Sequence, residues 1–225
     1  MNVHHVYTLF EGSGSFDVDG YYTHFKNKIF PDYSDPARII YSNSSGYAVS
    51  KGVSVSANYS FYFPLAFTLN GNIQQVIEYE KDPLTDQEYK RYVEYAPKWS
   101  GAATANYIFR KSKITLAYTG QITGPMRLPE VFDLNSEGVP LSTARPIWSR
   151  PFSLHNVQVT KQFSRAWSVY FGIQNLANYI QRTSPLVGYN DPNAAIGFSP
   201  FFDTSYAYAP NHGREFYIGF KWSVE

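Results

Sequence analysis

Residues that could carry out catalysis are few in this chain. Its five histidines are scattered at His4, His5, His24, His155 and His212. The chain contains no cysteine, so it has neither a disulfide framework nor a thiolate metal site. No G-x-S-x-G, H-E-x-x-H or G-x-G-x-x-G motif is present, and the segment 12–14 (Gly-Ser-Gly) indicates a turn rather than a phosphate loop. We therefore predict that the chain is not an enzyme and has no catalytic residue, cofactor or metal centre.

One acidic stretch could offer oxygen ligands to Ca²⁺. Its carboxylates are Glu78, Glu80, Asp82, Asp86 and Glu88. The stretch lacks the regular spacing and the turn glycine of a dedicated calcium loop, and Lys81, Lys90 and Arg91 neutralise much of its charge. We predict a solvated loop here, with a calcium site as the alternative.

Residues suited to binding a ligand gather in three segments, 31–46, 124–150 and 181–213. The candidate ligand-contact residues are Tyr33, Arg38, Tyr41, Arg145, Trp148, Tyr189, Phe198, Phe201, Phe202, Tyr206 and Tyr208. Cationic and aromatic groups together suit an anionic, planar ligand. Packing of these segments against one another is the alternative interpretation of the same residues.

The composition is unusual for a water-soluble domain. Of 225 residues, 20 are Tyr, 17 Phe and 4 Trp, whereas only 16% are charged and the net charge is +1. A soluble domain has too little interior to bury so many aromatic side chains, but the wall of a membrane barrel has room for them. The near-neutral charge argues against nucleic acid as a partner, since phosphate binding requires clustered cations.

Alternation of apolar and polar residues with a period of two recurs throughout the chain, as in strands. In the run 113–122, for example, Ile114, Leu116, Tyr118 and Ile122 share one face, opposite Lys113, Thr115, Ala117, Thr119 and Gln121. The pattern predicts nine strands at 2–9, 14–30, 47–62, 64–80, 97–109, 113–122, 151–162, 167–178 and 214–224. The longest strongly apolar run, about 61–67, is far too short for a spanning helix.

The connections between these strands are alternately very short and very long. The long ones cover about 31–46, 81–96, 124–150 and 181–213, which favours a transmembrane barrel over a soluble sandwich. Asp17 and Asp19 alternate with Phe16 and Val18, so we expect both carboxylates to face the lumen. An odd number of strands leaves two open edges. Together with the lack of a signal peptide, this predicts a fragment whose missing strands lie upstream.

Four segments resemble the TonB-dependent outer-membrane receptors, particularly those of Bacteroidetes-type bacteria. They are Asp19-Gly-Tyr-Tyr-Thr-His-Phe-Lys-Asn-Lys-Ile29, Tyr95-Ala-Pro-Lys-Trp-Ser-Gly101, Tyr118-Thr-Gly120 followed by Gly124-Pro-Met-Arg-Leu-Pro129, and Ile173-Gln-Asn-Leu-Ala-Asn178. The resemblance covers essentially the whole chain. It identifies residues 1–225 as the C-terminal part of such a barrel, although the chain ends on Trp222-Ser-Val-Glu225 rather than on the family's usual terminal aromatic.

The resemblance implies an all-β fold, an antiparallel transmembrane β-barrel segment with about nine strands of a presumed 22-stranded barrel. It also implies partners outside this chain: a plug domain, the remaining barrel strands, and TonB, which acts through an N-terminal part absent here. The surroundings would be the lipid of the outer membrane of a Gram-negative bacterium.

The function that follows from the resemblance is TonB-energised uptake of a scarce, bulky small-molecule ligand, first of all a ferric siderophore. Cobalamin is the next candidate ligand, followed by haem or an oligosaccharide. A passive or structural barrel without energy coupling is the rival class. A third class, an outer-membrane hydrolase in which His155 pairs with a lumen serine, is not favoured by any spacing in the sequence.

Overall fold

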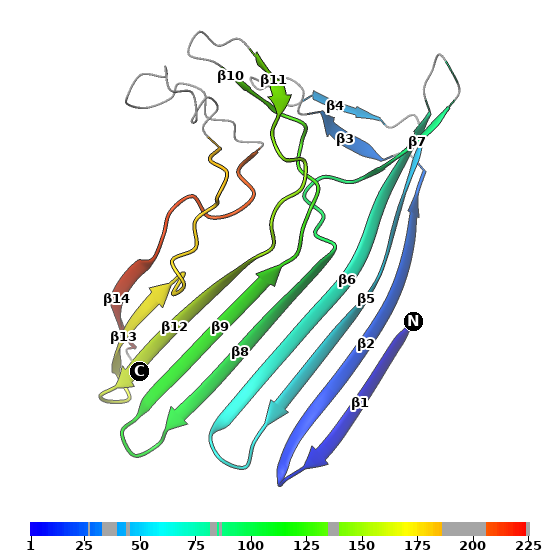
Figure 1. Ribbon diagram of the computed structural model, residues 1–225. Coiled ribbons are helices and arrows are strands. Elements are labelled where there is room, and N and C mark those ends of the chain that lie inside the picture. The colour runs from blue at the N-terminus through cyan, green and yellow to red at the C-terminus, as the bar shows by residue number, and fades with distance from the viewer. Residues whose placement is uncertain are drawn as a thin grey trace.

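Nine long strands form one curved antiparallel sheet in the computed structural model, as Figure 1 shows. The structure describes residues 1–26, 28–32, 40–43, 46–81, 85, 87–134, 140–185 and 206–223. In order across the sheet, the strands are β1 (Asn2–Leu9), β2 (Gly12–Phe25), β5 (Tyr47–Ser60), β6 (Leu65–Lys81), β8 (Trp99–Phe109), β9 (Ile114–Thr123), β12 (Phe152–Gln162), β13 (Trp167–Gln174) and β14 (Glu215–Trp222). The prediction of nine antiparallel strands is therefore confirmed.

Each strand pairs with the next long strand along the chain, as in a barrel wall built from hairpins. In the described strand order, β1 and β14 are the two edges, each with one neighbour. Among the described residues, no helix is long and apolar enough to span a membrane.

The strand register divides the side chains into two separate faces. One row of cross-strand partners runs through Val18, Val55, Gly71, Gly101 and Ile122. The adjacent row, on the other face, runs through Asp19, Ser54, Asn72, Ser100 and Thr123. Because neighbouring residues of a strand point to opposite faces, the register keeps apolar rows and polar rows apart over the whole sheet.

The apolar face is strongly exposed in this sheet. Its exposed members include Leu69, Ile73, Leu116, Phe171, Phe216, Ile218, Phe220 and Trp222. On a soluble sheet this face would be covered by a second layer, but hydrocarbon can cover the outer wall of a membrane barrel. We refer to it as the outward face and to the polar face as the lumen face.

Short turns join the strands at one end of the sheet and long connections join them at the other (Figure 1). The long connections contain three features that the alternation pattern did not predict. β3 (Ile29–Asp32) pairs with β4 (Ile40–Asn43), and β10 (Phe132–Leu134) pairs with β11 (Pro140–Ala144). β7 (Glu88–Tyr92) pairs with the part of β6 that lies beyond its pairing with β8.

β6 alone has 17 residues, roughly 56 Å at about 3.3 Å per residue. Since about ten tilted residues cross a bilayer, β6 is longer than one crossing requires, and its end beyond Ile73 projects past the start of β8.

Several predicted strand ends were wrong. The strand expected at 14–30 ends at Phe25, the one expected at 167–178 ends at Gln174, and the one expected at 97–109 begins at Trp99. The second end has a clear backbone cause, because Asn175 has φ 50° and Asn178 has φ 54°. These left-handed conformations, which asparagine tolerates better than most residues, cannot continue a strand.

The two faces generate a test of the register. Leu69 is an outward residue, 49% exposed, whereas Asn70 belongs to the lumen face. Replacing Leu69 with Arg places a charge against hydrocarbon and should lower the free energy of unfolding by about 2–4 kcal/mol. The matched change Asn70→Arg should cost much less. Reversible unfolding of the assembled barrel in lipid measures both values, and equal or inverted costs would show that the faces are assigned the wrong way round.

Candidate functional site

The lumen face carries a shallow polar groove across five strands. It has a volume of 280 Å³, and its polar lining residues are Asp19, Ser54, Ser56, Asn70, Asn72, Ser100 and Gln121. Asp19 accepts a 2.5 Å hydrogen bond from Nδ2 of Asn2, and Ser54 donates to Oδ1 of Asn72 at 2.9 Å. His4 contacts Asp17 on the same face. Both aspartates therefore lie where the sequence predicted them, on a surface able to bind a polar partner.

At the long-connection end of the groove, the strand that pairs with β6 is interrupted between β7 and β8. β7 and β8 both pair with β6, and residues 94–97 leave the sheet between them. Val93 N–H still donates to the Val76 carbonyl at 3.1 Å, and Gln74 N–H to the Lys98 carbonyl at 2.9 Å. Tyr95 in this segment has φ 56°. The carbonyl of Pro97 still accepts a 2.9 Å hydrogen bond from Nε2 of Gln74 on β6. The motif 95–101 overlaps the start of the strand predicted at 97–109. In the structure, the chain lies off the wall in the first half of this motif and rejoins the wall at Trp99.

Three segments pair in sequence to form a packed layer at the long-connection end: 93–98 pairs with 125–131, which in turn pairs with 145–149. Tyr95 N–H donates to the Arg127 carbonyl at 2.9 Å, and Lys98 N–H donates to the Pro125 carbonyl at 3.0 Å. On the other side, Leu128 N–H donates to the Ile147 carbonyl at 2.9 Å. We call the segments 93–98, 125–131, 145–149, 181–184 and 206–210 the collar.

A small apolar core lies inside the collar. Met126, Leu128 and Tyr206 are its buried members, and Tyr95 and Tyr208 pack against them. Tyr206 is completely buried, and its hydroxyl donates to the Pro146 carbonyl at 2.8 Å. Because an apolar core fixes the segments that contribute to it, the collar holds together chain segments that are far apart in the sequence.

A lysine sits between two aromatic rings at the edge of the collar. Nζ of Lys98 lies 4.1 Å from the centre of the Trp148 ring and 5.0 Å from that of Tyr92, and the two rings meet edge to face at 5.3 Å. A cation over aromatic faces is attracted by their quadrupoles. Lys98 therefore joins the end of β7 to the segment that precedes β12.

The last long connection is held at both of its ends by one side chain. Gln181 is buried, and its Nε2 donates to the carbonyls of Thr183 at 2.7 Å and Tyr206 at 2.9 Å. Its Oε1 accepts the backbone N–H groups of Tyr208 and Ala209, each at 3.0 Å. We call this arrangement the Gln181 clasp. It ties Thr183 to residues 206–209, the described chain on the two sides of the segment 186–205.

Arg145 reinforces the same region. Its Nη1 donates to the Ser184 carbonyl at 2.8 Å, and its guanidinium lies 5.0 Å from the centre of the Tyr206 ring. The residue is buried, so its charge is used within the collar rather than displayed at the surface.

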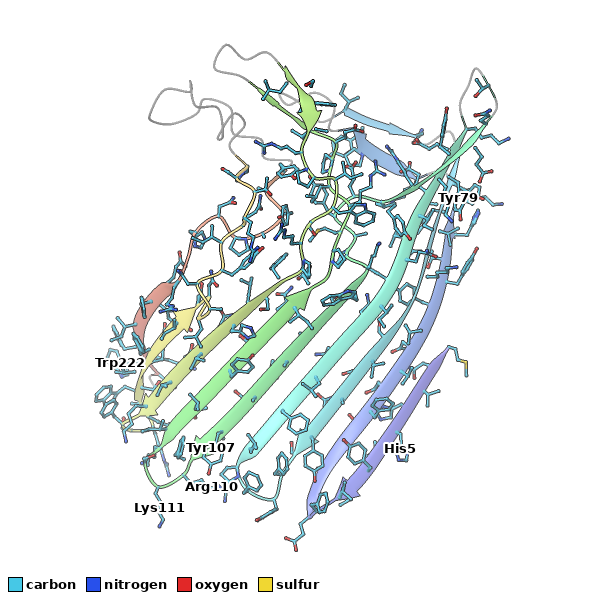
Figure 2. The ribbon with its side chains drawn as sticks, viewed as in Figure 1. His5, Tyr79, Tyr107, Arg110, Lys111 and Trp222 are labelled. Carbon is cyan, nitrogen blue, oxygen red and sulfur yellow. The ribbon has the colours of Figure 1, made fainter. Side chains whose placement is uncertain are left out.

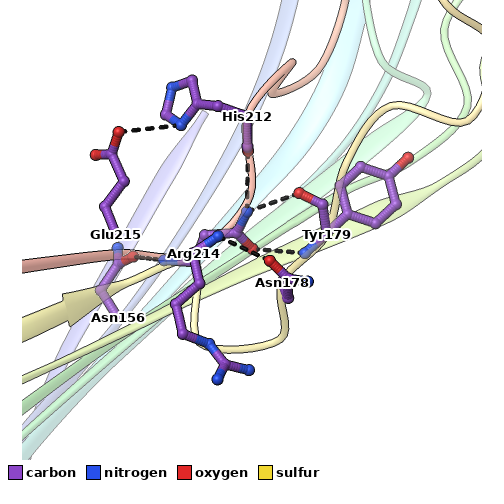
Figure 3. Close-up of polar contacts among 7 residues, drawn as sticks. Asn156, Asn178, Tyr179, His212, Arg214 and Glu215 are labelled. Atoms are coloured by element: carbon purple, nitrogen blue, oxygen red, sulfur yellow. Dashed lines mark hydrogen bonds and ion pairs between the residues drawn. The ribbon is translucent and has the colours of Figure 1, made fainter.

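Two asparagines form the turn that follows β13, shown in Figure 3. Asn175 donates through Nδ2 to the Tyr179 carbonyl at 2.6 Å and accepts the Tyr179 N–H at 2.8 Å. Oδ1 of Asn178 accepts the N–H of Arg214 at 2.8 Å, just before β14 begins. The motif 173–178 is therefore a joint that aligns the last two strands below the long connection.

The acidic stretch is not the solvated loop that the sequence predicted, as far as its described residues show. Glu78 is buried, its Oε2 lies 3.0 Å from Nε of Arg91, and Glu80 lies 3.6 Å from the same guanidinium. Asp82 and Asp86 lie outside the described residues. Within the described part of the chain, no group of three or more His, Cys, Asp or Glu residues could hold a metal ion.

Burial perturbs the Glu78 carboxyl, which lies on the projecting end of β6. Burial raises its pKa to about 7, and the neighbouring Glu80 acts in the same direction against the opposing effect of Arg91. Glu78 also borders a 60 Å³ cavity lined in part by Glu94 and Tyr95 of the collar. A change in the charge of Glu78 therefore acts at the cavity where the collar residues Glu94 and Tyr95 face β6.

The predicted ligand-contact residues are only partly described. Tyr33, Arg38, Tyr189, Phe198, Phe201 and Phe202 lie outside the described residues. Tyr41 is 66% exposed on β4. Arg145, Tyr206 and Tyr208 come together in the collar, and Trp148, from the same segment as Arg145, packs on Lys98 and Tyr92. For these four, the contacts are those of the loop-packing interpretation.

The histidine–serine pair considered in the sequence does exist, but on the other face. Nε2 of His155 lies 3.1 Å from Oγ of Ser153, and its Nδ1 lies 2.7 Å from the Tyr118 hydroxyl. Ser153 pairs with Ile122 and His155 with Gly120, which places the trio on the outward face rather than in the lumen. A triad requires a third group that orients the histidine, usually a carboxylate; here that position belongs to a phenol. A Cβ at Gly120 would collide with the Tyr118 hydroxyl, which explains the motif 118–120.

Sequence reasoning missed the residues that organise the collar. Lys98, Asn175 and Asn178 lie in segments that the alternation pattern predicted as strand, at 97–109 and 167–178, and that pattern gives no sign of the contacts they make. The tolerance of asparagine for left-handed backbone could have identified the latter two. Glu78 and Gln181 have no comparable local signal, because their burial depends on segments distant in the sequence.

Comparison with known proteins agrees with this architecture. The family model described as "TonB dependent receptor-like, beta-barrel" matches residues 6–176. No curated protein matches the chain.

Among solved structures, a mutant of the ferric enterobactin receptor PfeA from Pseudomonas aeruginosa has a TM-score of 0.60 at 16% identity, over 99% of this chain and 30% of that one. The apoprotein of the FrpB iron transporter from Neisseria meningitidis has a TM-score of 0.59 at 11% identity, over 98% and 30%. The copper transporter OprC has a TM-score of 0.59 at 14% identity, over 99% and 30%. The chain thus spans about 30% of the length of these structures, and the similarity is one of fold.

The Gln181 clasp generates a first prediction for this site. Gln181→Ala removes four hydrogen bonds from the two ends of the 186–205 segment. Each is worth about 1 kcal/mol, so amide hydrogen exchange at Tyr208 and Ala209 should accelerate at least about tenfold. The control is Gln162→Ala, a change at an exposed position near the short turns. Unchanged exchange in Gln181→Ala would mean that the collar does not depend on the clasp.

Glu78 generates a second prediction. Its pKa is about 7 in the folded chain against an ordinary value of 4.5. Between these pH values the folded state therefore binds more protons than the unfolded state, and stability falls as pH rises through this window. Glu78→Gln should flatten that decline. Thermal midpoints measured at pH 5 and pH 8, with Glu11→Gln in an exposed turn as the control, provide the comparison. A decline of equal size in Glu78→Gln would assign the pH dependence to other groups.

Proposed function

Because this chain belongs to the TonB-dependent receptor β-barrel family, we propose that it forms the C-terminal part of an outer-membrane receptor for TonB-energised uptake. The match over residues 6–176 is the observation that carries the proposal. The division of the sheet into an apolar outward face and a polar lumen face supports it, since a barrel wall meets lipid on one side and a polar interior on the other.

The remainder of the receptor supplies what this sheet lacks. Unpaired strand edges are not tolerated in a bilayer, so further strands of a presumed 22-stranded barrel pair with β1 and β14. A plug domain lies against the lumen face, and the groove at Asp19, Asn72 and Gln121 is the surface that suits its polar groups. TonB acts through the N-terminal part of the receptor, in a Gram-negative outer membrane.

The ligand we propose is a ferric siderophore. The exposed Tyr41, together with candidates outside the described residues such as Arg38 and Phe201, offers aromatic and basic groups that suit an anionic, planar ligand. Similar structures are described as a ferric enterobactin receptor and an iron transporter. Cobalamin, haem and an oligosaccharide are the alternatives. Because a copper transporter is similar to this chain in fold to the same extent, copper is added to the ligands to be tested.

Uptake by living cells tests both the ligand and the energy coupling. Cells that carry the complete receptor as their only such transporter would be supplied with ferric enterobactin, cobalamin, haem, copper or an oligosaccharide, with and without functional TonB. We expect TonB-dependent uptake of the ferric siderophore. Accumulation that is equal with and without TonB would instead indicate a passive barrel, and TonB-dependent uptake of another member of the panel would replace the ligand.

The loop aromatics allow a separate prediction about capture at the cell surface. In the complete receptor, Phe201→Ala combined with Phe202→Ala should weaken ligand binding at least about tenfold, since an interfacial aromatic contributes about 2 kcal/mol or more. Phe163→Ala at the short-turn end is the control. Tyr206→Ala is measured separately, because Tyr206 is completely buried in the collar and acts there as packing. Unchanged affinity in the correctly assembled double variant would leave the two phenylalanines without a binding role.

A further inference from the structure

A single lysine interrupts the apolar outward face next to the short turns. The row of cross-strand partners through β8, β9, β12, β13 and β14 reads Phe109, Ile114, Lys161, Val169 and Phe220. Four of these five side chains are apolar and suited to hydrocarbon. Lys161 is half-buried, and its Nζ lies 5.8 Å from the centre of the Phe163 ring and donates to the Ser112 carbonyl. A lysine in such a row keeps its stem on the apolar wall and its ammonium at the level of the lipid headgroups.

More cations surround Lys161 in two adjacent turns. Arg110, Lys111 and Lys113 lie in the turn between β8 and β9, and Arg165 lies in the turn between β12 and β13; all four are exposed. The turns are joined by the Gln162 N–H, which donates to the Lys113 carbonyl at 2.9 Å. Figure 2 shows Arg110 and Lys111 at the tip of the first turn, with Tyr107 directly above. These residues form one continuous patch on the rim.

Among the residues that the structure describes, the patch is confined to one part of the rim and has no Asp or Glu in the turns and strand ends beside it. The segments 107–117, 157–173 and 216–223 contain no Asp or Glu. The other two short turns differ, since that between β1 and β2 holds Phe10 and Glu11 and that between β5 and β6 is uncharged. Positive charge is therefore concentrated beneath β8–β14 rather than spread evenly around the edge.

Exposed aromatic rings lie on the outward face beside this patch. Phe163 and Trp167 stack at 4.3 Å, and Trp167 is the cross-strand partner of Trp222, which is 70% exposed. Aromatic girdles mark the depth of the membrane interface. Cations at that depth attract the phosphates of anionic lipids, and the exposed wall above them can take the acyl chains.

We propose that Lys161, Lys111 and Arg165, with the neighbouring aromatic rings, form a binding site for an anionic phospholipid headgroup of the inner leaflet. The proposal rests on the proposed function for its orientation, in which the short turns face the periplasm. The lipid binds lengthwise against the outer wall of β9, β12 and β13, with its phosphate at the two joined turns. The other half of the rim, which has no such patch, binds zwitterionic and anionic lipids alike.

The test is lipid titration of the complete, delipidated receptor, followed by native mass spectrometry. Phosphatidylglycerol should bind at least about tenfold more tightly than phosphatidylcholine, and the triple variant Lys111→Gln, Lys161→Gln and Arg165→Gln should abolish this preference. The control variant Lys26→Gln, Lys81→Gln and Lys90→Gln removes the same charge from exposed positions at the opposite end of the strands and should retain it. Equal affinity for the two lipids in the wild-type receptor, or an equal loss in both variants, would overturn the proposal.

Two further arms keep the result interpretable. If the triple variant does not assemble, the double variant Lys111→Gln and Arg165→Gln changes only exposed turn residues. Raising the salt concentration should then reduce the wild-type preference for phosphatidylglycerol, as screening of charge requires; a salt-independent preference would contradict the site. Uptake is measured in living cells that carry the same receptor variants. A receptor that imports ligand without a lipid preference defeats only the lipid site, whereas a lipid preference without energised uptake defeats only the transport function.

Discussion

The structure depends on one constraint, the period of two that every strand shares with its neighbours. A shift of one residue in any pairing would exchange the two faces beyond that point, placing groups such as Asp19 and Asn72 in hydrocarbon. The bilayer makes such an error costly, because it provides no water to satisfy polar side chains or backbone groups. The apolar rows and polar rows therefore specify the register jointly, from β1 to β14.

Where the chain leaves the bilayer, polar side chains replace strand pairing as the organising interactions. Gln181 bonds to the backbone at both ends of the last long connection, and Asn175 and Asn178 align the start of β14 with the end of β13. Lys98 joins the end of β7 to the segment before β12, because its ammonium lies over the rings of both Tyr92 and Trp148. Gln181 and Asn175 are buried, where an unmade hydrogen bond is costly. The collar is thus an ordered layer, distinct from the wall that supports it.

The wall could be read from the sequence because alternation is a local property of each strand, as in 113–122. The collar could not. Residues 97 and 98 look like the start of a strand until the pairing of 95–98 with 125–127 is known. Glu78 resembles its acidic neighbours until Arg91 of β7 covers it. The sequence offered Arg145, Trp148 and Tyr206 as ligand contacts because they are cationic or aromatic. Composition alone does not separate a residue that packs from one that binds, and these three pack.

The Gln181 clasp has a consequence for how such a protein can diverge. The Gln181 clasp holds the chain on both sides of the 186–205 segment, so a change in the length or sequence of that segment leaves the flanking residues in place. The entropy of closing a loop grows only logarithmically with its length, so doubling the segment costs about 0.6 kcal/mol. Insertions, deletions and wholesale replacement between the clasped ends are therefore nearly neutral for assembly. New specificities can evolve on an unchanged barrel, with selection acting on the segment and not on the wall.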